Sequence, residues 1–128
     1  MNILAPISAG ELLDKLSILY IKAERIKDPD KLKHINKEVG FLEAIIHTNS
    51  MDKNIGYKHL MTRLQIINND IWELEDGIRE LSAANQHDDK FIQTAKSIHT
   101  TNDKRAQVKT LINTVYNSNI VEVKSYKE

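Results

Sequence analysis

The chain has 128 residues, of which 41% are hydrophobic, and this is enough for one domain to bury a core without metals or disulfides. Because 18 basic residues balance 18 acidic ones, the formal net charge is zero and indicates binding to neither nucleic acid nor a membrane surface. Cysteine is absent, which excludes a disulfide framework, a thiolate nucleophile and a cysteine metal site.

These properties lead us to expect a soluble, cytoplasmic protein. No apolar run approaches the roughly 18 residues of a membrane span. The start, MNILAPISAGELL, lacks the basic residues and apolar core of a signal peptide. A chain without cysteine suits a reducing cytoplasm. Low aromatic content, four glycines and two prolines favour long helices over a sheet with many turns.

The first helix is expected over residues 8–27 and the second over residues 29–47. Ser8 and Glu11 have the spacing of a capping box, in which each side chain satisfies a free backbone N–H group of the other residue. Asp28 suits the N-cap of the second helix, and Pro29 suits its first position. Apolar residues recur at helical steps in both segments: Leu12, Leu16, Leu19, Ala23 and Ile26, then Leu32, Ile35, Val39, Leu42 and Ile46.

The third helix, expected over residues 57–84, has the most regular pattern. Its apolar seam continues for three heptads with coiled-coil regularity: Leu60, Leu64, Ile67, Ile71, Leu74, Ile78 and Leu81. After a break at residues 85–87, Asp88 and Asp89 suit the positive start of a fourth helix over residues 88–116. Each of these two helices would be roughly 40 Å long at 1.5 Å per residue.

We therefore expect a single all-α domain over residues 1–128. It would be an antiparallel bundle of about four helices built around a long hairpin of the third and fourth. The surplus seam of this hairpin would be available to a second copy, so we expect a homodimer. Residues 119–128 read NIVEVKSYKE, a modest strand signal that is too short to fold alone. They would form a docked extended arm, either within the chain or exchanged between subunits, or else a frayed tail.

Polar residues on the first and third helices have two explanations. The first helix carries a charged arc opposite its leucine seam: Glu11, Asp14, Lys15, Lys22 and Arg25. A solvated face explains this arc, although Ile18 in its middle indicates that something covers it.

The third helix carries a polar row beside its seam: Asn68, Trp72, Glu75, Asp76 and Arg79. A Glu75–Arg79 salt bridge and a bond from the Trp72 N–H to Asn68 would explain the row, but it would also suit a pocket wall.

The expected inward stripe of the fourth helix is interrupted by polar residues. It reads Phe91, Ala95, Ile98, Asn102, Arg105, Lys109, Ile112 and Tyr116. Burying the two cations unpaired would cost several kcal/mol each, so facing carboxylates or an anionic ligand would be needed. The stripe could instead shift to Ile98, Val108, Leu111 or Ile112, and Val115, leaving the stems of Arg105 and Lys109 packed and their charged heads in water. A register device or internal ion network, and a ligand site, are the other two interpretations.

Three motifs occur in a specific combination and order. They are P-[VI]-S-x-G-E-L-[IL]-D-K at residues 6–15, N-x-x-[LI]-W-x-[IL]-E-D-x-I-R at residues 68–79 and N-D-x-R-A at residues 102–106. Together they resemble an uncharacterised bacterial and phage family labelled domain of unknown function 6165, over nearly the whole chain. The family ending E-E-K-S-Y reads E-V-K-S-Y here, so the double glutamate is not kept. The resemblance implies a link to surface-glycan pathways and no particular reaction.

Most of the polar residues noted above on three separate helices fall within these motifs. We therefore predict that they meet in one polar cluster between the first, third and fourth helices. The candidate cluster comprises Asp14, Lys15, Arg25, Asn68, Trp72, Glu75, Asp76, Arg79, Asn102, Asp103, Arg105 and Lys109.

The sequence favours a helical binding or assembly module, with an unknown protein or a small anionic ligand as partner. It has no phosphate-binding loop, and its five histidines form no metal-ligand pattern, so no cofactor or metal is expected and no catalytic residue is assigned. The main alternative is a magnesium-dependent nucleotide pyrophosphohydrolase in which Arg105 and Lys109 neutralise phosphates. Its Mg²⁺ ligands would be two carboxylate pairs at helical spacing: Glu11, Asp14, Glu73 and Asp76. A helical mutase that grips a dicarboxylate with Arg25, Arg105 and Lys109 is a third possibility.

Overall fold

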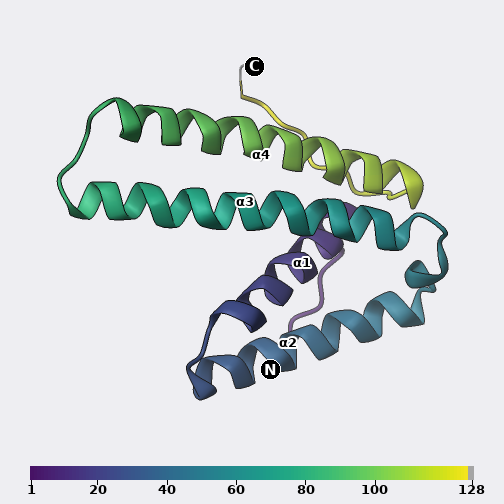
Figure 1. Cartoon of the computed structure of the whole chain (residues 1–128). Helices are drawn as coiled ribbons and strands as arrows, with labels where there is room; N and C mark the ends of the chain where they lie inside the picture. The colour runs from purple at the N-terminus through teal and green to yellow at the C-terminus, as the bar shows by residue number, and fades with distance from the viewer. Residues whose placement is uncertain (127–128) are drawn as a thin grey trace.

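Figure 1 shows the computed structural model of the chain, which describes residues 1–126. Within these residues it contains helices and no strand, which confirms the all-α prediction. The elements are α1 (Ala9–Arg25), α2 (Pro29–Thr48), a 3-10 helix η1 (Met51–Lys53), α3 (Tyr57–Ala83) and α4 (Asp89–Val115). Each α-helix begins and ends within two residues of the bounds expected from the sequence. No helix in the described part of the chain is both long and apolar enough to cross a membrane.

Side chains at the helix starts account for these bounds. Ser8 Oγ accepts a hydrogen bond from the backbone N–H of Glu11 at 3.1 Å. Asp28 and Asp88 each accept bonds from two backbone N–H groups in the first turns of α2 and α4. These caps satisfy donors that have no partner inside a helix. The capping-box prediction was wrong in its second half, because the Glu11 carboxylate bonds Lys109 on α4.

The four helices are distributed unevenly (Figure 1). α3 and α4 form a long antiparallel hairpin with the most extensive helix–helix contact in the molecule. α1 packs against both helices of the hairpin, and α2 packs against α1. We call residues 57–73 and 99–115 the hairpin base, where α1 and α2 lie. Residues 74–98, which include the connecting loop, form the hairpin tip.

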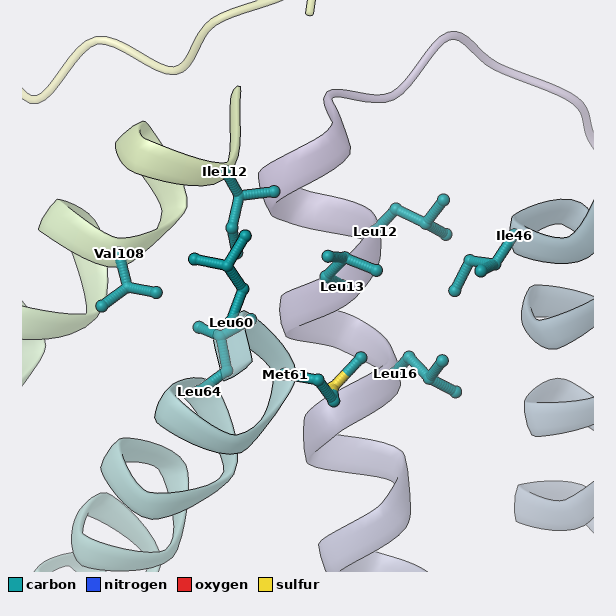
Figure 2. Close-up of a cluster of buried hydrophobic side chains, with 9 residues drawn as sticks. All are labelled: Leu12, Leu13, Leu16, Ile46, Leu60, Met61, Leu64, Val108 and Ile112. Carbon is teal, nitrogen blue, oxygen red and sulfur yellow. The ribbon is translucent and has the colours of Figure 1, made fainter. Parts of the chain in front are cut away.

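The hydrophobic core lies at the hairpin base (Figure 2). It is built from side chains of all four α-helices: Leu12, Leu13, Leu16, Ile46, Leu60, Met61, Leu64, Val108 and Ile112. Close packing of this kind is the main favourable term in folding. In the tip, by contrast, each residue of 74–98 stays partly or fully exposed, including the seam residues Leu74, Ile78 and Leu81. One hairpin is therefore fully packed at one end only.

The buried stripe of α4 differs from the expected one. Val108 and Ile112 are 1% and 0% exposed, whereas Asn102 is exposed, so the stripe drawn through Asn102 was wrong at that residue. Arg105 and Lys109 lie at the edge between α4 and α1, where their charged ends bond carboxylates of α1. Of the residues named for a shifted stripe, Val108 and Ile112 are buried, but Leu111 and Val115 are each 41% exposed. The two cations are paired within the chain, as the internal ion network interpretation held.

Residues 117–126, which we call the C-terminal arm, run back along α4 (Figure 1). The reversal occurs at Asn117, whose φ of 51° lies in the left-handed region that asparagine tolerates. The backbone N–H of Ser118 then donates to the carbonyl of Asn113 at 2.8 Å and closes the end of α4. Ser118 Oγ also accepts a bond from the N–H of Ala9 at 3.3 Å. The arm is thus docked on its own chain and, within the described residues, forms no strand.

Candidate functional site

The centre of the polar site is an ion pair between α1 and α4. Asp14 is 1% exposed, and its carboxylate accepts a bond from Arg105 Nε at 2.9 Å and a second bond from Arg105 Nη2. This two-point contact uses the planar fork of the guanidinium, which gives strong and directional bonds to carboxylates. The hydrogen bonds to Asp14 raise the pKa of Arg105 above its ordinary value, so the cation persists at all physiological pH values.

α3 completes this centre through Asn68. Its Nδ2 donates to Asp14 Oδ1 at 2.9 Å and to Ser17 Oγ at 2.7 Å. Asp14, Ser17 and Asn68 are all buried, and a buried polar group is stable only when it is hydrogen-bonded. The Asp14 carboxylate of α1 therefore bonds both Asn68 of α3 and Arg105 of α4, and so links three helices. The Trp72 ring, whose N–H was expected to bond Asn68, contacts Arg25 instead.

A second cation, Lys109, lies one turn further along α4. Its Nζ donates to Glu11 Oε2 on α1 at 2.7 Å and to Glu122 Oε2 on the C-terminal arm at 2.8 Å. Burial alone would lower the pKa of Lys109, but the bonds to Glu11 and Glu122 outweigh it and the pKa lies above its ordinary value. Only 13% of the Lys109 side chain is exposed, compared with 68% for Glu122.

Gly10 lets α1 approach α4 closely enough to form these pairs. A Cβ atom at this position would lie 2.5 Å from the backbone oxygen of Lys109, so any other residue would force the two helices apart. The backbone N–H of Gly10 donates to Asn113 Oδ1 at 2.7 Å across the same contact. The start of α1 is thus anchored directly on α4, next to Glu11 and Lys109. Gly10 lies in the first sequence motif, but its role was not predicted.

A cavity of about 610 Å³ lies between α4 and the C-terminal arm. The α4 side is lined by Asn102, Asp103, Arg105 and Lys109, among others, and the arm contributes Glu122, Lys124 and Tyr126. Lys124 bonds Asp103 and thereby ties the arm across the cavity. This hydrogen bond lowers the pKa of Asp103. We call this space the arm groove.

A smaller cavity of about 300 Å³ is lined by both residues of the central ion pair, Asp14 and Arg105. It is lined by α1 residues and by Glu38 of α2, and Arg105 reaches both cavities. Lys15 bonds Glu38 at 3.1 Å across the α1–α2 contact, so it lies beside the centre without bonding it. Arg105 is therefore the residue around which both hollows are arranged.

Arg25 and Trp72, which were predicted for the cluster, form a separate contact. Arg25 bonds Glu73 Oε1 at 2.5 Å and Asn69 Oδ1 at 3.3 Å, and its guanidinium lies 5.5 Å from the centre of the Trp72 ring. This geometry is a cation–π contact reinforced by an ion pair. It attaches the end of α1 to α3, further from the arm groove than Asp14.

The remaining predicted residues are outside the centre. Glu75 and Arg79 form a 3.7 Å pair one turn apart on the hairpin tip, and Asp76 is exposed beside them. Asn102 is exposed, but it lines the arm groove together with Asp103. The structure thus brings together Asp14, Asn68 and Arg105 at the centre, with Lys109, Asp103 and Asn102 along the groove.

Four residues of the site were not predicted as members of the cluster: Gly10, Ser17, Glu122 and Lys124. A signal was available for Gly10 and Ser17, since each lies within a few residues of Asp14 on the expected first helix. Glu122 and Lys124 had no such signal, because the arm docks through a backbone reversal at Asn117 rather than through a helical pattern.

Three of the four carboxylates considered for magnesium are bonded to cations of the chain, and the fourth, Asp76, is exposed on the hairpin tip. Glu11 bonds Lys109, Asp14 bonds Arg105, and Glu73 bonds Arg25. Within residues 1–126 no three histidine, aspartate or glutamate side chains lie close enough together to hold a metal ion. A divalent cation at Glu11 and Asp14 would therefore have to displace Lys109 and Arg105.

Comparison with known proteins places the sequence in a family. Residues 3–128 match the model of a family described as "Family of unknown function (DUF6165)". The chain belongs to this family. No curated protein and no solved structure matches it. In this DUF6165 protein the features that bear on function are the arm groove and the paired charges beside it.

Proposed function

We propose that this protein is a helical binding module whose ligand is a small molecule bearing a phosphate or carboxylate, held in the arm groove. The observation that carries the proposal is the position of Arg105 and Lys109. They are four residues apart on α4, so they lie on the same helix face, and both line a cavity of about 610 Å³. Two adjacent cations beside a hollow of this size suit an anionic group.

The hydrogen bonds of Arg105 support this proposal. A guanidinium carries five N–H groups, and two of them bond Asp14. Among the described residues the other three have no protein acceptor. Asp14 and Asn68 fix the orientation of the guanidinium before any ligand arrives, and such preorganisation favours binding because less freedom is lost.

The ionisation of the groove favours binding over acid–base catalysis. General acids and bases work best when their pKa lies near the operating pH. In the groove, the pKa values of Arg105 and Lys109 are raised by their carboxylate partners, and that of Asp103 is lowered by Lys124. All three shifts move the pKa values further from pH 7, so the three groups stay charged near neutral pH.

Thermal melting with anionic probes tests the proposal. The probes are inorganic phosphate, pyrophosphate and a sugar nucleotide, the last because the family resemblance points to glycan pathways. A ligand at 100 times its Kd stabilises the folded state by about 2.7 kcal/mol, which is a rise of several degrees in Tm. A separate incubation of the protein with the sugar nucleotide and magnesium tests the pyrophosphohydrolase alternative. That alternative predicts hydrolysis of the nucleotide, whereas a binding module leaves it intact.

A pair of matched variants locates the binding. Lys109→Met keeps the apolar stem of the side chain but removes its charge, and we expect it to abolish the ligand-induced rise in Tm. Lys104→Met makes the same change at an exposed residue of α4 that does not line the groove, and it should keep the rise. If wild type responds to none of the probes, or if Lys109→Met responds as wild type does, the proposal is wrong.

A further inference from the structure

We infer that the C-terminal arm is a displaceable internal ligand, in which the Glu122 carboxylate occupies the position on Lys109 that the anionic group of an external ligand takes. This inference rests on the proposed function and adds how the arm groove is regulated. It starts from the contact between Lys109 Nζ and Glu122 Oε2 at 2.8 Å.

The two partners in this contact differ in how firmly the fold holds them. Lys109 is 13% exposed and also bonds Glu11, whose helix is anchored on α4 through Gly10. Glu122 is 68% exposed and belongs to a segment without regular secondary structure. When Glu122 leaves, Lys109 therefore keeps a carboxylate partner and its place in the groove. The cation is permanent and the arm carboxylate is exchangeable.

The arm is held by few contacts besides its ion pairs. Its apolar side chains do not enter the core, since Ile120, Val121, Val123 and Tyr126 are all exposed. Beyond Ser118, which is tied to α1 and to the turn, the side-chain bonds that hold it are Glu122–Lys109 and Lys124–Asp103. Exposed ion pairs contribute little to stability and are weakened by salt. The arm can thus detach while the helices stay folded.

Replacing Glu122 by an external anion keeps Lys109 paired with a negative group on this side of the groove. Lys109 loses one carboxylate and gains one anionic group, while Asp14 remains bonded to Arg105. An anion with further oxygens can also reach the N–H groups of Arg105 that Asp14 does not use. Glu122 offers a single carboxylate at this place, so a ligand with several anionic oxygens such as pyrophosphate can form more bonds than the arm does.

Affinity for pyrophosphate, measured by isothermal titration calorimetry, tests this inference on the full chain. If the Glu122 carboxylate occupies the site in about nine molecules of ten, it weakens the apparent affinity for pyrophosphate about ten-fold. We therefore expect Glu122→Gln to bind pyrophosphate about ten times more tightly than wild type does. Glu80→Gln makes the same chemical change at an exposed residue of the hairpin tip, and its affinity should equal that of wild type.

NMR relaxation of the arm amides provides the second measurement. At saturating pyrophosphate, residues 119–126 of the wild-type chain should become mobile on the nanosecond timescale while α4 stays rigid. Equal affinity of wild type and Glu122→Gln, or an arm that stays rigid at saturation, would overturn the inference and leave the proposed function standing. Failure of both chains to bind would overturn both proposals. Binding to Glu122→Gln alone would support both.

Discussion

The base and the tip of the α3–α4 hairpin are made of the same two helices but differ in what covers them. At the base, α1 adds leucine side chains, and residues such as Leu64 and Ile112 are fully buried. At the tip, Leu74 and Ile78 remain half-buried because two helices alone cannot enclose a seam. The charged site lies only at the base, where α1 packs against α3 and α4. Burial of Asp14 requires donors from α3 and α4 together, so the site and the core depend on the same packing.

The largest expected effect concerns the central ion pair of the base. Asp14→Ala leaves Arg105 without its carboxylate and Asn68 without an acceptor, and we expect a loss of about 3–5 kcal/mol in unfolding free energy. The double variant Asp14→Leu, Arg105→Met should recover most of this loss, because two well-packed apolar residues can replace a buried pair. Urea unfolding measures both changes. A single variant that costs less than about 1 kcal/mol would show that the pair is not buried as described.

Truncation of one leucine at each end of the hairpin compares base and tip directly. Leu64→Ala removes a fully buried side chain of the core and should cost about 2–5 kcal/mol. Leu74→Ala removes a half-buried one, and a loss of only about 1 kcal/mol is expected in the monomer. Urea midpoints at constant protein concentration give both values. Equal losses at the two positions would mean that the tip is packed against something in solution.

Gly10→Ala tests the close approach of α1 to α4. The added Cβ would lie 2.5 Å from the Lys109 carbonyl oxygen, so α1 must move outwards at a cost of about 1–3 kcal/mol. Gly77→Ala is the matched control, because a Cβ there meets no atom within 4 Å. Since alanine favours helix over glycine, the control should gain about 0.5–1 kcal/mol. A neutral Gly10→Ala substitution would contradict the described contact.

The smallest expected effect is the pH dependence of the arm. The pKa of Asp103 is lowered from 3.8 by its bond to Lys124, so this bond stabilises the docked arm above pH 3.8 and is lost as the pH falls through the lowered value. The pKa of Lys109 is raised from 10.5, so its contribution is complete below pH 10.5 and is lost as the pH rises through the raised value. NMR relaxation of residues 119–126 should therefore be constant between about pH 5 and pH 9. Release of the arm near pH 7 would contradict these pairings.

Helical periodicity and caps were sufficient to predict the four helices. Ser8, Asp28 and Asp88 lie at the N-caps where the sequence placed helix starts. The polar residues Asn68 and Arg105 could also be singled out because they border or interrupt an apolar seam, and Asp14 because it lies on the charged arc of the first helix. A buried polar residue in such a position needs partners, and the neighbouring helices provide them.

The hairpin-tip residues were assigned to the site wrongly because sequence periodicity gives the face of a helix but not its depth in the fold. α1 has 17 residues and spans about 25 Å, whereas α3 has 27 residues and spans about 40 Å. α1 therefore ends beside Trp72 and does not reach Glu75, Asp76 or Arg79. The homodimer expected from the surplus seam of the tip stays a prediction.

Anion binding in the arm groove is tested most directly by an NMR titration of the ¹⁵N-labelled chain with pyrophosphate. If the arm groove binds anions, shift changes should be concentrated in α4 residues 102–113 and in the arm, with the signals of the hairpin tip unchanged. The ¹⁵N-labelled Lys109→Met chain should show no such changes at the same concentrations. Shift changes spread over the tip, or changes of equal size in Lys109→Met, would contradict anion binding in the arm groove.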